Sequence, residues 1–189
     1  VGSASYTAIL IRPSGGAARL ITGATTAGLS MIDFNGADNV TVDGLNTGGN
    51  SLTIANTTVS ATSGTSTIRF ILDATNNTIT NCNLQGSVSS SVATNGAVIF
   101  FSTGTSTGND NNTISNNDIG PAGVNLPTKA ILGNGSTTTT AIGNSGNVIN
   151  NNNIFDYFGA AVTSAGIATN GGCNTWSITN NRFYQTGTR

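Results

Sequence analysis

Ile114-Ser115-Asn116-Asn117-Asp118-Ile119 is one of five copies of a six-residue phrase: apolar, any residue, Asn, small polar, any residue, apolar. The other copies are Ile54–Val59, Ile79–Leu84, Ile149–Ile154 and Ile178–Phe183. Their first residues are 25, 35, 35 and 29 positions apart. A period of about 20 to 50 residues is typical of solenoid proteins, in which each repeat buries its apolar face against the next. The phrase therefore predicts a repeat fold.

Short β-branched runs accompany the phrase. Ile68–Leu72 reads as a strand, Thr78–Asn81 as a second one, and the phrase then turns the chain into a third strand around Leu84. The same order returns three more times. Ala8–Ile11 and Ala97–Phe101 also read as buried strands. Three short strands per repeat predict an all-β parallel β-helix of about six to seven coils, forming a single domain over residues 1–189.

The Asn residues of the phrase have a structural explanation. A sharp turn between two strands needs a residue that tolerates positive φ, and Asn is the best choice after Gly. Stacked Asn side chains also hydrogen-bond along a solenoid and satisfy buried amides. We predict a structural Asn ladder that contains Asn56, Asn81, Asn116, Asn117, Asn151, Asn152, Asn180 and Asn181.

The two cysteines follow from the same register. Cys82 replaces the second Asn of its phrase, so we expect it to stack with the small polar residues of the other copies: Thr57, Asn117, Asn152 and Asn181. Cys173 lies about three coils away in this register, too far for a disulfide. We predict that both thiols are reduced. The register before Ile54 stays open, because Val42 precedes Ile54 by only 12 residues.

The composition excludes several classes of function. Hydrophobic residues make up 37% of the chain and favour a folded domain over disorder. The net charge is -1 and the six basic residues are scattered, so we expect no nucleic-acid binding. No run of about 18 apolar residues is present, so we expect no membrane insertion.

Two segments carry a resemblance to a known family. Asn111-Asn112-Thr113-Ile114-Ser115-Asn116-Asn117 resembles the coils of right-handed parallel β-helix proteins of the pectin-lyase-like superfamily. Ile32–Leu45 is similar to repeats in large secreted bacterial surface proteins, especially of Bacteroidetes type. The resemblance extends from about Ile32 to Tyr184 and implies a right-handed β-helix. It leaves the function open, because this scaffold carries lyases, hydrolases, tailspikes, adhesins and passive stalks.

The acidic residues do not match the enzymes that this resemblance suggests. Resemblance to a pectate lyase would imply Asp ligands for calcium with an Arg or Lys base, and resemblance to a polygalacturonase an Asp cluster with His. All seven acids are Asp, and the chain has no Glu and no His. Glycoside hydrolysis needs two carboxylates about 5 to 9.5 Å apart, and Asp73, Asp110 and Asp118 share no register. We therefore expect no catalytic residues and no enzymatic activity.

The sequence suggests three other kinds of site. Asn109–Asn112 offers four oxygen-bearing side chains, but calcium usually takes two or more carboxylates; we expect a polar turn and no cofactor, with structural calcium as the alternative. Outward Thr columns beside the inward Ile resemble ice-binding arrays, but Ala55, Val148 and Asn150 interrupt them, which favours ordinary exposed strands. Phe155 and Phe183 fit inward or corner positions. Tyr157, Phe158 and Tyr184 are candidate glycan-contact aromatics.

Loops rich in Gly, Ser and Thr, here called excursions, separate the strands, and we expect them to emerge on one side of the solenoid: Thr57–Thr67, Ser87–Asn95, Ser102–Asp110, Pro121–Thr128 and Gly133–Gly146.

Val1–Ser5 has no signal-peptide character and the chain has no initiator Met. We expect a processed chain or a segment of a longer secreted protein.

These observations together predict a non-catalytic extracellular structural β-helix: a stalk, filament subunit or adhesive segment at a bacterial surface. Its expected partners are other copies of itself or adjoining coils of a longer chain, and surface glycans. The alternative is a carbohydrate-binding or polysaccharide-cleaving β-helix module.

Overall fold

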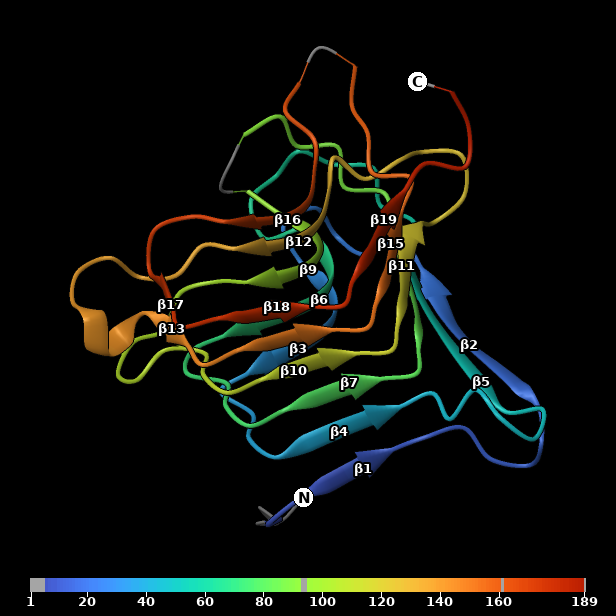
Figure 1. The fold of residues 1–189 in the computed structure, drawn as a ribbon, viewed down its shortest axis with the longest axis horizontal. Coiled ribbons are helices and arrows are strands. Elements are labelled where there is room, and N and C mark those ends of the chain that lie inside the picture. Colours follow the sequence, from blue (N-terminus) through green and yellow to red (C-terminus); the bar gives the residue numbers. More distant parts are fainter. Residues whose placement is uncertain (1–5, 93–94, 161, 189) are drawn as a thin grey trace.

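Short strands stack into a parallel β-solenoid (Figure 1). The computed structural model describes residues 6–92, 95–160 and 162–188. Val1–Ser5, where the sequence lacks signal-peptide character, lie outside the described residues. Three sheets run along the solenoid, and every pairing within them is parallel. The predicted fold class is therefore confirmed.

Each sheet takes one strand from each coil. Sheet A contains, in order, β1 (Ile9–Ile11), β4 (Val40–Asp43), β7 (Thr78–Thr80), β10 (Thr113–Ser115), β14 (Val148–Asn150) and β18 (Ser177–Thr179). Sheet B contains β2 (Ala18–Gly23), β5 (Ser51–Asn56), β8 (Asn83–Gly86), β11 (Asp118–Pro121), β15 (Asn153–Phe155) and β19 (Arg182–Tyr184). Sheet C contains β3 (Ser30–Asn35), β6 (Ser66–Ile71), β9 (Ala97–Phe101), β12 (Lys129–Gly133) and β16 (Ala165–Thr169).

A small extra layer lies beside one corner. There β13 (Asn144–Ser145) pairs with β17 (Cys173–Asn174), next to a short 3-10 turn, η1 (Thr140–Ile142). Figure 1 shows this group at the left of the view, where chain passes from sheet C to sheet A. Among the described residues, no helix has the length and apolarity that a membrane span requires.

The described residues form five complete coils and the first two strands of a sixth. The expected number of six to seven was slightly too high. Most coils are long: Thr78 pairs with Thr113, and Thr113 pairs with Val148, which is 35 residues per coil in both steps. The shorter spacing of 25 residues, from Ile54 to Ile79, does not correspond to the length of one coil.

The reason is that the first copy of the phrase lies in a different sheet from the others. Ile54 is in sheet B and pairs with Leu84, whereas Val42 holds the position in sheet A that pairs with Ile79. Asn56 is therefore not part of the predicted ladder; its Nδ2 donates to the Ser66 carbonyl oxygen at 2.7 Å. The stacking of Cys82 with Thr57 was wrong for the same reason.

The core consists of columns of inward side chains, one column member per coil. In sheet A the column is Ile11, Val42, Ile79, Ile114, Ile149 and Ile178. In sheet B it is Ile21, Ile54, Leu84, Ile119, Ile154 and Phe183. The middle members of both columns are fully buried. The end members are exposed because they lie in the first and last coils of the described residues.

Aromatic rings extend this core along sheet C. Phe34 stacks on Phe70 with centroids 4.9 Å apart, and Phe70 stacks on Phe101 at 4.5 Å. Trp176 then meets Phe101 edge to face. Ala97–Phe101 is buried as predicted. Ile9–Ile11 is a strand but is exposed, contrary to the prediction, since it belongs to the first coil.

The excursions emerge at two corners rather than on one side. Thr57–Thr67, Ser87–Asn95 and Pro121–Thr128 connect sheet B to sheet C, and Ser102–Asp110 and Gly133–Gly146 connect sheet C to sheet A. Ala93 and Thr94 lie outside the described residues. From β7 onward, the corner between sheets A and B has only two residues. Long loops therefore gather at the other two corners.

Candidate functional site

Three Asn ladders run along the corners of the solenoid. The first contains Asn117, Asn152 and Asn181 between sheets A and B, where Asn117 Nδ2 donates to Asn152 Oδ1 at 3.1 Å and Asn152 Nδ2 to Asn181 Oδ1 at 2.9 Å. The second contains Asn77, Asn112 and Asn147 directly before the strands of sheet A. The third joins Asn109 to Asn144 at 3.0 Å. The predicted ladder exists, whereas the second and third ladders lie outside the six-residue phrase and were not predicted.

The first Asn of each phrase has a different role from the second. The turn between sheets A and B is formed by residues with φ between 55° and 57°: Asn81, Asn116, Asn151 and Asn180. Asn116 is exposed, whereas its neighbour Asn117 is buried. The predicted ladder therefore separates into a row of left-handed turn residues and a row of stacked amides.

Both cysteines occupy ends of these rows. Cys82 stands one coil before Asn117, and its backbone N–H donates to Asn117 Oδ1 at 2.9 Å. Cys173 pairs with Asn144 at the end of the third ladder. Both are free thiols, as expected. Burial raises the pKa of Cys82 to about 12 and also raises the pKa of Cys173, so neither is an activated nucleophile.

Each of the seven Asp carboxylates accepts a hydrogen bond from the next coil. The donors are Arg69 to Asp33, Thr75 to Asp38, Asn81 to Asp43, Thr105–Gly108 to Asp73, Ser145 to Asp110, Asn153 to Asp118 and Thr186 to Asp156. The pair between Arg69 and Asp33 is the only salt bridge among the described residues. The acidic side chains therefore link neighbouring coils in pairs.

Asp73 has the most extensive of these contacts. Its carboxylate accepts the backbone N–H groups of Thr105, Ser106, Thr107 and Gly108, and the Thr105 hydroxyl at 2.6 Å. Burial favours the protonated acid, but the hydrogen bonds from Thr105, Ser106 and Gly108 outweigh it and lower the pKa of Asp73 well below its ordinary value. The loop thus encloses an ionised carboxylate.

The segment considered for calcium places its side chains in separate roles. Asn109 and Asn112 are buried members of two different ladders. Asp110 accepts the N–H of Ser145 at 2.6 Å, and Asn111 is a left-handed turn residue. Among the described residues, no group of three or more His, Cys, Asp or Glu side chains is gathered in a way that could hold a metal ion.

Lys129 is a buried cation that was not predicted from the sequence. Its side chain lies at the start of β12, and Nζ donates to the carbonyl oxygens of Ser90 at 3.1 Å and Val92 at 3.0 Å. Burial lowers its pKa. Thr128 also donates to the Ser90 carbonyl, at 2.7 Å. Thr128 and Lys129 thus fix the loop that begins after β8, and their role is structural.

The predicted outward columns are present on sheet A from β7 onward. Thr78, Thr113, Val148 and Ser177 pair in one row, and Thr80, Ser115, Asn150 and Thr179 pair in the other. The Ser115 and Thr80 hydroxyls are 3.1 Å apart. Thr53 and Ala55 lie in sheet B instead. The outer face of sheet A from β7 onward therefore carries mostly hydroxyl groups, interrupted by Val148 and Asn150.

The candidate aromatics are spread over several environments. Tyr157 packs against the core, and Phe158 is partly exposed. Tyr184 stacks on Phe155 with centroids 5.5 Å apart, and the Arg182 guanidinium lies 4.5 Å from the Tyr184 centroid. Contrary to the prediction, Phe155 points outward, since it alternates with inward Ile154. The Tyr184 ring thus contacts both Phe155 and Arg182.

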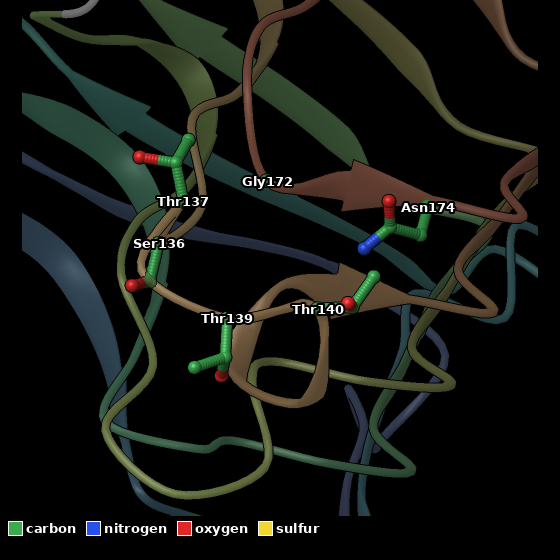
Figure 2. Close-up of a pocket in the computed structure, with 6 residues that line it drawn as sticks. All are labelled: Ser136, Thr137, Thr139, Thr140, Gly172 and Asn174. Carbon is green, nitrogen blue, oxygen red and sulfur yellow. The ribbon is translucent and has the colours of Figure 1, made fainter.

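A polar hollow of about 240 Å³ lies beside η1 and β17. Figure 2 shows hydroxyl and amide groups around it, without a charged side chain. Its lining residues are Ser136, Thr137, Thr139, Thr140, Gly172 and Asn174. Groups of this kind can hydrogen-bond a neutral polar ligand, but they include no general acid or base.

Comparison of this chain with protein-family models, with curated proteins and with solved structures found no match.

Proposed function

We propose that this chain is a non-catalytic structural β-solenoid, acting as a stalk, filament subunit or adhesive segment at a bacterial surface. The observation that carries the proposal is the use of all seven Asp carboxylates as acceptors for the neighbouring coil. Each of these contacts uses part of the carboxylate's acceptor capacity to link two coils, which favours a structural over a catalytic role for the acidic side chains.

The extracellular location and the bacterial source rest on the sequence resemblance. The Asn-rich phrase supports assignment to the right-handed, pectin-lyase-like type of β-helix, and Ile32–Leu45 supports an origin in a large secreted surface protein. Low charge and a uniform stack of coils suit an extended spacer, because each coil contacts only its neighbours and length grows with coil number.

A reducing-sugar assay over a panel of plant, algal and bacterial polysaccharides tests the non-catalytic role. We expect no turnover above the buffer control. Asp73→Asn and Asp156→Asn are expected to lower the melting temperature without changing this background. Turnover that disappears in one Asp→Asn variant with an unchanged melting curve would overturn the proposal.

The hollow beside η1 favours a second candidate, a carbohydrate-binding module. Hydroxyl and amide groups from Ser136, Thr140 and Asn174 are suited to the hydroxyl groups of a neutral sugar. A glycan array is the direct test. Specific binding that is lost in Asn174→Ala, but retained in a variant at Val124, an exposed residue in the separate loop between β11 and β12, would favour this candidate.

A further inference from the structure

The outer face of sheet A carries a two-dimensional array of mostly uncharged polar side chains. Side chains alternate along a strand, so the residues directly before and after each inward member of the sheet A column point outward. The pairing registers align the residues before the inward members in a first row: Thr41, Thr78, Thr113, Val148 and Ser177. The residues after them form a second row: Asp43, Thr80, Ser115, Asn150 and Thr179.

This register removes one of the interruptions that the sequence suggested. Ala55 lies in sheet B, and the strand that belongs in this place in sheet A is β4, which adds Thr41 to the first row. Three consecutive coils therefore present Thr at the same position. Val148 comes next, and its branched side chain has the shape of Thr with a methyl group in place of the hydroxyl. Asp43 is the only charged residue of the two rows, and it accepts a hydrogen bond from Asn81 Nδ2.

The hydroxyl groups of the first row are available to a ligand. The hydroxyls of Thr41, Thr78 and Thr113 have no hydrogen-bond partner within the described part of the chain, and all three residues are partly exposed. In the second row, the Thr80 and Ser115 hydroxyls are 3.1 Å apart. Each Thr of the first row thus offers one hydroxyl and one methyl group to whatever lies on this face.

The array is held in place from below and from both sides. Figure 1 shows the strands of sheet A stacked side by side along the solenoid. Between the two rows, the inward side chains Ile79, Ile114 and Ile149 are fully buried. One Asn ladder runs directly before these strands, and another, which includes Asn117, runs after them. Neighbouring coils are therefore fixed relative to each other, and a surface that is already ordered loses little conformational entropy on binding.

We propose that this face of sheet A binds ice. The spacing along each row is the distance between neighbouring strands, about 4.8 Å, and residues two apart on one strand are separated by about 6.6 Å. Both distances lie close to the repeat distances between oxygen atoms on a prism face of ice. A lattice of water molecules therefore meets a hydroxyl or methyl group at successive points of the array. The inference goes beyond the proposed structural role, since a stalk or filament needs no ligand on this face.

The chemistry of the two rows favours ice over other periodic ligands. A polyanion such as nucleic acid requires clustered basic groups, and the rows contain no Lys or Arg. Binding sites for sugars are commonly lined by aromatic side chains, and the rows contain no aromatic residue. The complete part of the array spans only the three coils from Thr41 to Ser115, because Val148 and Asn150 follow. The expected activity is therefore modest, and it should grow when these two positions are filled.

Thermal hysteresis and inhibition of ice recrystallisation test the inference, with pure ice as the probe. We expect the unaltered chain to depress the freezing point below the melting point, whereas serum albumin at the same concentration does not. Thr78→Tyr with Thr113→Tyr should abolish the effect, because two bulky rings break the flat face while Tyr is well accepted in exposed strands. Thr53→Tyr, on the outer face of sheet B, is the matched control and should leave the effect unchanged.

A gain of activity separates ice binding from a merely structural role of the Thr residues. Val148→Thr with Asn150→Thr lengthens the hydroxyl array by one coil and should increase the thermal hysteresis. An unchanged or smaller effect in this variant would count against the array. Circular dichroism and thermal melts verify that each variant folds, and the single change Thr113→Tyr replaces the double Tyr variant if the latter does not fold.

Three results would overturn the inference. The first is an unaltered chain that has no effect on ice growth. The second is an effect that survives Thr78→Tyr with Thr113→Tyr, since the contact with ice would then lie elsewhere. The third is retention on crystalline cellulose without any effect on ice, which would indicate a polysaccharide surface instead. None of these results changes the outcome of the reducing-sugar assay, so the two proposals fail separately.

Discussion

Asn117 donates from Nδ2 to Oδ1 of Asn152 in the next coil, 3.1 Å away, and the same oxygen also accepts the Asn117 backbone N–H. A single amide thus satisfies two donors from the preceding coil. Its own Nδ2 donates in turn to the Ile114 carbonyl. This arrangement lets buried backbone groups at a two-residue corner find partners without water.

Asn117→Ala should destabilise the fold by about 3 kcal/mol. The change leaves the buried Cys82 N–H and the Ile79 carbonyl without their Asn117 partner, and an orphaned buried polar group costs about 1–3 kcal/mol. Urea unfolding measures the loss. Thr78→Ala on the outer face of sheet A is the control and should change stability by less than about 0.5 kcal/mol. Equal losses in both variants would contradict the role of the ladder.

At Asn116, the backbone conformation should decide which substitutions the fold tolerates, whereas at Asn117 the side-chain hydrogen bonds decide it. Its φ of 56° lies in the left-handed region, which Gly adopts freely and a β-branched residue does not. Asn116→Gly should therefore be nearly neutral, whereas Asn116→Val should cost about 1–2 kcal/mol more. Thermal melts of the two variants check this. Similar stabilities for Gly and Val would show that the turn does not require positive φ.

Asp73 should make the fold sensitive to acid. Its pKa in the folded chain lies below the ordinary value of 3.8, so its stabilising contribution is complete above about pH 4 and is lost as the pH falls further. Asp73→Asn should lower the melting temperature at pH 7, and the difference from the unaltered chain should shrink toward pH 2. A difference that is the same at both pH values would exclude the ionised carboxylate as the cause.

Cys82 should be unreactive in the native chain. Burial raises the pKa of its thiol to about 12, so almost no thiolate is present at pH 8. With Cys173→Ser to remove the other thiol, a maleimide should label Cys82 only after denaturant is added. Rapid labelling in buffer would show that the corner opens on its own.

Cys82 also offers a test of whether the first ladder can be lengthened. Because Cys82 stands one coil before Asn117, an amide there can donate to Asn117 Oδ1 and toward the Val42 carbonyl, which the Cys82 thiol already approaches at 3.9 Å. Cys82→Asn should keep or raise the melting temperature, while the larger apolar Cys82→Leu should lower it by overpacking. A large loss with Asn would mean that the position does not accept an amide.

The strands from Ile79 onward could be predicted because their period is regular. Copies at Ile79, Ile114 and Ile149 lie 35 residues apart, and the structure pairs these three residues in one sheet. The copy at Ile54 misled the prediction, since its letters match the phrase while its strand belongs to sheet B. The true counterpart in sheet A, at Val42, is followed by Asp43 and Gly44 rather than by Asn. Local pattern alone does not distinguish the two sheets.

The polar contacts were less accessible from the sequence. Asn77, Asn112 and Asn147 also repeat at 35 residues, so the second ladder had a signal that the six-residue phrase does not include. No repeat in the sequence indicated the partners of Asp73 and Lys129. They lie in irregular loops of the adjacent coil, and their approach depends on loop conformations rather than on period.

The equivalence of Asn112 and Asn147 makes the length of this molecule adjustable in whole steps. Both residues directly precede a strand of sheet A in the same ladder. Removing residues 113–147 would join Asn112 to Val148 and bring β7 against β14, β8 against β15 and β9 against β16. The axis would shorten by the spacing of one strand, about 4.8 Å. Gene duplication or deletion in units of 35 codons can thus set the reach of such a chain without redesigning its interior.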